Sequence, residues 1–319
     1  MNKDEFKALL IQSPKEIALD DLTTDDIHRL RITVRATAFE TFFMPSGHKK
    51  LYVIFSAVGR DRRPYPIFQR VTWYESFDGM FLWIDDPTRH ETNIAPTYYF
   101  GTKDSNYLEL ICEMIHKFLD IYGLSCKDLV FISSSNGGFA ALWCSRKLYG
   151  STCLAFNPQL NVPLHYRKVR NKFEHALSVS FDDESLRERF YIDNIDKESE
   201  SKICIYSNVK SPSDKIQMDA FFQKNGIEYK YGLQKVNNIW VIIANIDAVD
   251  THLAQPTPYV SRIMERLMSD EWGGMEISPQ KIEIINALLE GMKDYYLALK
   301  NNKKLQNQIE LLNKQNDVC

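Results

Sequence analysis

The sequence of 319 residues lacks the features of several special classes of protein. No hydrophobic run approaches the roughly 18 residues that a membrane helix needs. The first ten residues (MNKDEFKALL) are charged and have no apolar segment like that of a signal peptide, so we expect no targeting signal. Charge of one sign is not in excess either: 39 basic and 42 acidic residues leave a net charge of −3, which argues against a nucleic-acid partner.

Cysteine is scarce, and its spacing excludes two further classes. The six cysteines include no Cys-x-x-Cys pair, so neither a zinc site nor a redox motif is predicted. Hydrophobic residues at 44% and charged residues at 25% exclude a disordered, collagen-like or disulfide-framework protein and are typical of a globular chain with a large core. We therefore expect reduced, mostly buried thiols in a cytoplasmic protein. The cysteines are Cys112, Cys126, Cys144, Cys153, Cys204 and Cys319.

Short apolar runs alternate with helical patterns along most of the chain. A strand at 129–132, a tight turn, a helix at 139–148 and a strand at 153–156 have the spacing of a βαβ unit. This unit implies an α/β fold with a mostly parallel sheet flanked by helices. Further strands are expected at 51–56, 80–84, 203–206 and 240–244, and further helices at 106–122, 214–224 and 258–268.

Three segments depart from this alternation and suggest how the chain is divided. Residues 1–48 are predicted to be an N-terminal extension, with a short helix and a β-rich run at 31–39. Residues 49–275 form the main domain, in which the polar, weakly periodic segment 159–200 is a cap-like insertion over the sheet. Residues 276–319 are predicted to be a C-terminal helix.

The C-terminal helix has a clear start and an unusual length. Ser278 suits the N-cap and Pro279 the first helical position. Apolar residues then recur at helical spacing for perhaps 30 residues, which is long for a globular domain. Two alternatives remain open: the helix packs along the domain, or its narrow apolar stripe pairs with a second copy and makes a homodimer.

The turn Ser133–Gly138 (SSSNGG) has the form small-x-nucleophile-x-small. A strand that bends sharply into a helix holds the middle residue, Ser135, in a strained conformation above the sheet edge. Strand and helix nearly touch there, so the positions of Ser133 and Gly137 must be small. The Asn136 N–H would lie at the helix N-terminus and could donate to an oxyanion. The alternative is a serine-rich turn in an ordinary doubly wound fold.

At this turn the chain resembles the α/β-hydrolase superfamily, over about residues 50–270. It departs from the pattern at one point, because the usual first glycine of GxSxG is Ser133. The resemblance implies an acid after a late strand and a histidine after the last one, completing a Ser-His-Asp triad with Ser135.

Two residues match these positions. Asp214 follows a late strand by roughly eight residues and suits the acid, although it could instead be a helix N-cap. Asp219 and Asp250 are weaker candidates. His252 follows the last strand and is the only histidine beyond residue 175, which suits the general base. The alternative is a loop histidine in a polar turn.

The remaining site residues are expected in two basic segments. The loop after the first core strand should supply the second oxyanion donor, the N–H of Ala57 or Val58. Arg60 lies near this mouth and could draw in an anionic substrate or a coenzyme phosphate. Arg167 and Arg170, in the insertion, could contact an acidic glycan. For both segments the alternative is a solvated basic surface.

A rival site is Asp85–Asp86, which could suggest the metal-binding carboxylates of a nucleotide-sugar glycosyltransferase. The Asp-x-Asp spacing is absent, and paired carboxylates before Pro87 more often begin a turn. No metal site is therefore predicted.

A narrower resemblance covers Tyr98–Phe139. This stretch is similar to bacterial capsular-polysaccharide biosynthesis proteins of the XcbB/CpsF type and, more distantly, to the accessory Sec-system acetyltransferases. The resemblance implies a serine-dependent O-acetyltransferase or esterase that acts on a surface or capsular polysaccharide or its precursor.

Further expectations follow from that role. The donor could be acetyl-CoA, without a tightly bound cofactor, and the protein would be cytoplasmic or peripheral at the inner membrane. The competing hypothesis is a non-catalytic scaffold in a capsule assembly and export complex at the membrane.

Overall fold

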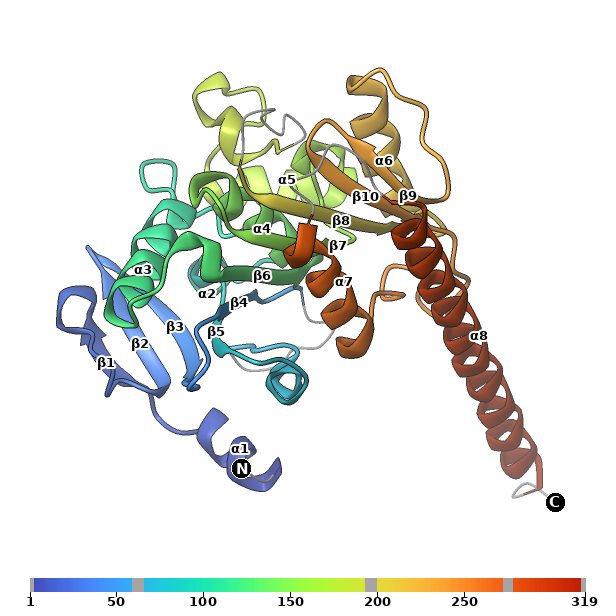
Figure 1. Cartoon of the computed structure of the whole chain (residues 1–319), viewed down its shortest axis with the longest axis horizontal. Coiled ribbons are helices and arrows are strands. Elements are labelled where there is room, and N and C mark those ends of the chain that lie inside the picture. Colours follow the sequence, from blue (N-terminus) through green and yellow to red (C-terminus); the bar gives the residue numbers. More distant parts are fainter. Residues whose placement is uncertain (1–2, 59–65, 193–199, 272–277, 317–319) are drawn as a thin grey trace.

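One ten-stranded sheet with helices on both faces organises the chain (Figure 1). The computed structural model describes residues 3–58, 66–192, 200–271 and 278–316. The strands are β1 (Lys15–Ala18), β2 (His28–Val34), β3 (Thr37–Met44), β4 (Leu51–Phe55), β5 (Met80–Ile84), β6 (Leu129–Ser134), β7 (Thr152–Phe156), β8 (Lys202–Asn208), β9 (Gly232–Val236) and β10 (Ile239–Ala244). The α-helices are α1 (Lys3–Leu10), α2 (Pro87–Thr92), α3 (Tyr107–Ile121), α4 (Ser135–Lys147), α5 (Arg167–Leu177), α6 (Pro212–Lys224), α7 (Pro258–Glu271) and α8 (Pro279–Asn316).

The strand order is β1-β2-β3-β5-β4-β6-β7-β8-β10-β9. The six central strands, from β5 to β10 in this order, run parallel to one another. Among the described strands, the antiparallel pairs lie toward the edges of the sheet, where β3 joins β5, β2 joins β3 and β9 joins β10. This confirms the predicted α/β fold with a mostly parallel sheet, and it brings the carboxyl ends of six strands to one edge.

The central strands are apolar throughout because both of their faces are buried. In β4, Val53 and Phe55 face the core beneath α3, α4 and α6, whereas Tyr52 and Ile54 face the core beneath α1, α7 and α8. Four cysteines are buried, Cys126 is half-buried, and none of these five forms a disulfide. Cys319 lies outside the described residues.

The N-terminal segment contributes three strands to the sheet. The β-rich run predicted at 31–39 belongs to two antiparallel strands, because the chain turns between Val34 and Thr37. Arg35 in this turn has a φ of +53°, the left-handed conformation of a tight connection. Residues 15–44 are therefore part of the same sheet as the main domain.

The segment 159–200 packs beside the sheet through aromatic side chains. Phe173 in α5, together with Phe181 and Phe190, is buried against Phe100 of the main body. The first residues of the segment lie near the carboxyl ends of the central strands. This position lets the insertion form one wall of a pocket there.

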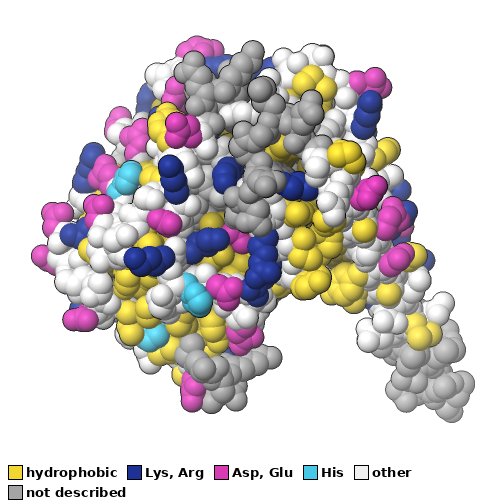
Figure 2. All heavy atoms as spheres, in the orientation of Figure 1, with side chains coloured by type: hydrophobic (Ala, Val, Ile, Leu, Met, Phe, Trp, Pro, Cys, Tyr) yellow, Lys and Arg dark blue, Asp and Glu magenta, His cyan; other side chains and the backbone are white. Residues whose placement is uncertain are grey.

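Helix α8 is the most unusual element. Its first half packs against β9 and α7 and buries Ile285 and Met292. Its far half projects away from the body (Figure 1), and every described side chain from 301 to 308 is exposed. Figure 2 shows hydrophobic side chains gathered on the surface beside the first half of this helix. Among the described residues, no helix is both long and apolar enough to cross a membrane.

Candidate active site

The β6–α4 junction has the geometry of a nucleophile elbow. The strand ends at Ser134 and the helix begins at Ser135 with no connecting loop. Ser135 has a φ of +52°, a strained value for a residue other than glycine. A Cβ on Gly137 would lie only 2.6 Å from the Phe55 carbonyl oxygen, so the close approach of helix and strand requires glycine there.

The serine that replaces the usual first glycine has a structural function. Ser133 is fully buried, and its Oγ accepts the Phe55 N–H at 2.8 Å. The side chain of Asn136 is buried as well and accepts the Tyr98 N–H at 2.6 Å. Ser134, the N-cap of α4, makes no side-chain capping bond, so the first N–H groups of this helix are not capped. The Asn136 N–H is one of them.

Asp214 and His252 lie directly against each other. Both carboxylate oxygens of Asp214 are 2.8 Å from His252 Nδ1. Asp214 does not cap its helix, because Ser211 occupies the N-cap and Pro212 follows it. Burial raises the pKa of Asp214, and this effect outweighs the hydrogen bonds from His252 and Ser211, which lower it.

The two weaker acid candidates have other partners. Asp219 forms an exposed ion pair with Lys215 at 2.6 Å. Asp250 accepts the backbone N–H of His252 at 3.0 Å, which shapes the turn and leaves the imidazole to Asp214. The carboxylate placed to orient His252 is therefore Asp214.

Ser135 and His252 line one pocket of about 410 Å³ at the carboxyl ends of the strands. No hydrogen bond joins these two residues in the described part of the chain. The Ser135 hydroxyl instead donates to Gln159 Oε1 at 3.3 Å. The structure thus places the serine and histidine at the same cavity, with the serine hydroxyl directed to a different acceptor.

The loop that carries His252 is fixed by side chains from distant elements. Four of them donate to its backbone carbonyls, which leaves the loop little freedom to move. The bonds are Asn208 Nδ2 to Thr251 (2.8 Å), Asn157 Nδ2 to His252 (2.5 Å), the Tyr206 hydroxyl to Ala254 (2.9 Å) and the Tyr296 hydroxyl to Gln255 (2.7 Å).

The predicted oxyanion loop is only partly available. The Ala57 N–H already donates to Gln69 Oε1 at 3.2 Å, and Gln69 Nε2 donates back to the Ala57 carbonyl at 3.0 Å. Val58 is 36% exposed and lines the pocket. Arg60 lies outside the described residues. Of the two backbone donors proposed from sequence, Val58 is the one without a partner among the described residues.

Arg167 and Arg170, the two arginines predicted in the insertion, do not line this pocket. Arg167 is exposed, and the Arg170 guanidinium lies over the ring of Phe181 at 5.7 Å. A different arginine lines the pocket, Arg70, together with the side chains of Gln159, His165 and Gln255.

Sequence reasoning missed these four residues for different reasons. Gln159 follows the end of β7, next to β6 in the sheet, so the rule that sites form at carboxyl strand ends could have found it. His165 precedes the histidine loop expected of the superfamily, so its position along the chain gives no signal for it. No sequence pattern marks Arg70 or Gln255, whose contacts with each other exist only in the folded chain.

The paired aspartates after β5 have structural partners. Asp86 caps α2 by accepting the Thr88 N–H at 3.1 Å, and it also accepts the Thr97 hydroxyl at 2.7 Å. Asp85 accepts the Ile67 N–H at 3.0 Å. Within the described residues, no three His, Cys, Asp or Glu side chains are grouped to hold a metal ion.

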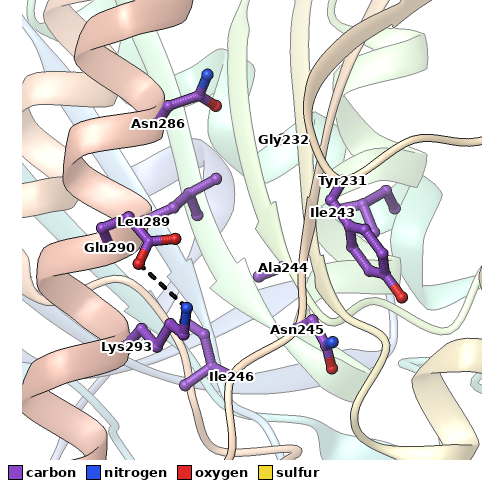
Figure 3. Close-up of a pocket in the computed structure, with 10 residues that line it drawn as sticks. All are labelled: Tyr231, Gly232, Ile243, Ala244, Asn245, Ile246, Asn286, Leu289, Glu290 and Lys293. Carbon is purple, nitrogen blue, oxygen red and sulfur yellow. Dashed lines mark hydrogen bonds and ion pairs between the residues drawn. The ribbon is translucent and has the colours of Figure 1, made fainter.

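A second pocket of about 440 Å³ separates α8 from the end of β10 (Figure 3). Asn245 and Ile246 line one side, and Asn286, Glu290 and Lys293 line the helix side. Glu290 and Lys293 are joined at 3.1 Å. Its described lining includes none of the predicted catalytic residues, so the pocket with Ser135 is the candidate active site.

Similar proteins were found by structure and not by sequence. The sequence matches no protein-family model, and a search of curated proteins found no match. Among solved structures, the chain is similar to the capsule O-acetyltransferase of Neisseria meningitidis serogroup A, with a TM-score of 0.55, 14% identity, and coverage of 78% of this chain and 97% of that one.

Two larger proteins are also similar. For the glycosylation-associated Gap123 complex of Streptococcus agalactiae, the TM-score is 0.53 at 16% identity, over 78% of this chain and 47% of that one. For the acylaminoacyl peptidase of Pyrococcus horikoshii, the TM-score is 0.56 at 11% identity, over 80% of this chain and 43% of that one. This chain therefore spans less than half of either. These likenesses show the fold alone, and that fold is the α/β-hydrolase fold.

Proposed function

We propose that this protein transfers an acyl group through Ser135. The observation that supports this most is that a serine at a sharp elbow and a histidine paired with a buried aspartate meet in one pocket. His252 takes the Ser135 proton as the hydroxyl attacks the acyl donor. Asp214 holds the imidazole and stabilises its protonated form.

The reaction needs one rearrangement of the serine side chain. The Ser135 hydroxyl must turn from Gln159 toward His252 before it can lose its proton to the imidazole. Catalytic hydrogen bonds of this kind often form only when substrate is bound. The Asn136 N–H, with that of Val58, then donates to the oxyanion of the tetrahedral intermediate. Water or a hydroxyl group of the acceptor resolves the acyl-serine, giving hydrolysis or transfer.

We place the acceptor among bacterial surface or capsular polysaccharides. One protein with this fold is a capsule O-acetyltransferase, which matches this chain over 97% of its own length. The stretch Tyr98–Phe139 also resembles capsule biosynthesis proteins. An O-acetyltransferase or esterase acting on such a glycan, with acetyl-CoA as donor, is consistent with a pocket whose lining includes the polar side chains of Arg70, Gln159 and Gln255. Its location in the cytoplasm or at the inner membrane remains a prediction.

A serine-directed fluorophosphonate tests the proposed nucleophile. We expect wild-type protein to be labelled and Ser135→Ala to lose the label, because the elbow serine is the activated one. Ser213→Ala is the matched control, since Ser213 lines the same pocket away from the elbow, and it should be labelled normally.

The same variant tests the competing scaffold hypothesis. In cells that lack the protein, Ser135→Ala should fail to restore the acylation of the surface polysaccharide, measured by mass spectrometry. Unlabelled wild type, or full restoration by Ser135→Ala, would favour a non-catalytic scaffold in capsule assembly.

A further inference from the structure

Arg70 stands beside the proposed nucleophile although it comes from a distant part of the chain. It lines the same pocket as Ser135 and His252. Its side chain is held in place, because Nη2 donates to Ser134 Oγ at 2.7 Å and to Gln255 Oε1 at 2.6 Å. The guanidinium therefore links the residue before the nucleophile to the loop of the general base.

No acidic side chain of the described residues pairs with the positive charge of Arg70. In the part of the chain that the structure describes, no carboxylate lies within ion-pair distance of it, and its Nη1 is buried without a hydrogen-bond partner. Burial lowers the pKa of Arg70 to about 10, so the group remains charged at neutral pH. By contrast, the buried Arg29 pairs with Glu40 at 2.8 Å. Arg70 is half-buried as a residue, but its Nη1 is shielded from water. A shielded cation with only neutral partners among the described residues is unfavourable unless a ligand compensates it.

The surroundings of Arg70 favour a negatively charged ligand. The ring of Trp73 covers its guanidinium at 5.2 Å, which restricts access to the other face. His165 and His252 also line the pocket, and a neutral imidazole can donate one hydrogen bond to an oxyanion. Asp250 is the one acidic residue of the described lining, and its carboxylate accepts the backbone N–H of His252.

We propose that Arg70 binds an oxyanion, a carboxylate or a phosphate, on one of the two reactants at Ser135. The inference rests on the proposed acyl transfer and adds a substrate class to it. Guanidinium matches the planar geometry of carboxylate and phosphate groups. The oxyanion can belong to the acyl donor, as a coenzyme phosphate, or to the acceptor, as an acidic sugar. The opposing interpretation is a purely structural role, in which the Arg70 side chain connects Ser134 to Gln255 and its charge is not needed.

Matched probes separate these possibilities. In the donor arm, thiol release from acetyl-CoA is compared with release from S-acetyl-N-acetylcysteamine, a thioester without phosphates. In the acceptor arm, p-nitrophenyl acetate supplies the acetyl group, and transfer to glucuronate is compared with transfer to glucose. The ratio of charged to neutral kcat/KM is measured in each arm for wild type, Arg70→Gln, Arg70→Lys and Arg35→Gln.

We expect Arg70→Gln to lower this ratio at least tenfold in one arm, and that arm identifies the reactant that carries the oxyanion. Arg70→Lys keeps the charge and should retain most of the ratio. Arg35→Gln removes an exposed arginine that does not line the pocket, so its ratios should match wild type. If Arg70→Gln lowers kcat/KM equally for the charged and the neutral probe in both arms, the role of Arg70 is purely structural and the inference is overturned.

A binding measurement keeps this test separate from that of the proposed function. Isothermal titration of CoA and of glucuronate is carried out on Ser135→Ala with and without Arg70→Gln. If no probe is turned over but Arg70→Gln raises one Kd at least tenfold, the acyl transfer fails and the oxyanion site stands. Equal Kd values, or no binding of either probe, overturn the oxyanion site.

Discussion

The buried carboxylate of Asp214 orients His252 but lowers the stability of the folded protein when it is ionised. The carboxylate is almost completely buried, and its partners are the imidazole of His252 and the hydroxyl of Ser211. Burial disfavours the ionised form that orientation of His252 requires. The folded protein consequently holds the proton of Asp214 to a higher pH than the unfolded chain does.

The substitution Asp214→Asn separates the effect of the carboxylate on catalysis from its effect on folding stability. We expect kcat for acyl turnover to fall roughly 10³- to 10⁴-fold, because the amide cannot stabilise a protonated imidazole. Asp219→Asn, on the exposed side of the same helix, is the control and should keep the wild-type kcat.

The stability of the same variant should depend on pH with a defined sign. The raised pKa means that wild type loses folding free energy as the pH rises from the ordinary value of 3.8 through the pKa of the folded state. The variant has no such loss. The melting temperature of Asp214→Asn minus that of wild type should therefore increase from pH 4 to pH 7. A difference that stays flat or decreases contradicts the assigned cause.

At the scale of elements, the site depends on a loop that α8 helps to hold. The Tyr296 hydroxyl donates to the Gln255 carbonyl at 2.7 Å and accepts the Gln255 N–H at 3.0 Å. Gln255 in turn receives a hydrogen bond from Arg70. The first half of α8 thereby becomes part of the support of the His252 loop.

Tyr296→Phe tests this support. Loss of the hydroxyl should destabilise the protein by about 1 kcal/mol and lower kcat for acyl turnover several-fold, because the loop is less firmly placed. The neighbouring Tyr295 is 50% exposed, so Tyr295→Phe is the matched control and should change neither quantity. Equal effects of the two variants on kcat would show that α8 does not position the loop.

At the scale of the whole molecule, the projecting half of α8 has no covering surface within the described chain. A helix of 38 residues is about 57 Å long. Leu299 and Leu305 remain 43% and 56% exposed on it. Helical segments without tertiary packing are marginally stable in water. Of the two sequence alternatives, packing along the domain accounts for only the first half, and we expect the second half to pair with another copy.

Removal of residues 301–319 tests this pairing. The deletion retains Tyr296 and the ion pair of Lys300 with Asp247, so the support of the active site is preserved. We expect full-length protein to have the solution mass of a dimer and the shortened protein that of a monomer, by light scattering. A monomeric full-length protein, or a dimeric shortened one, would exclude pairing through this helix.

Much of the fold could be predicted because its signals are local. Continuous apolar runs identify strands buried on both faces, and Ser133 and Gly137 meet the size limits of the elbow. The edge strands were harder to predict. The strand β9 is short and half-polar, and the β2–β3 turn carries neither glycine nor proline. Their pairing depends on neighbours that a pattern along the chain does not reveal.

The sequence by itself determined the parallel core, the elbow at Ser135 and the candidacy of Asp214 and His252, because burial patterns and chain order carry that information. Only the tertiary structure decided that Asp214 contacts His252, that Ser135 turns to Gln159, and that Arg70 lines the pocket with no ion-pair partner among the described residues. These are contacts between side chains far apart along the chain. Their formation depends on how the strand ends and loops come together in space, which no local pattern encodes.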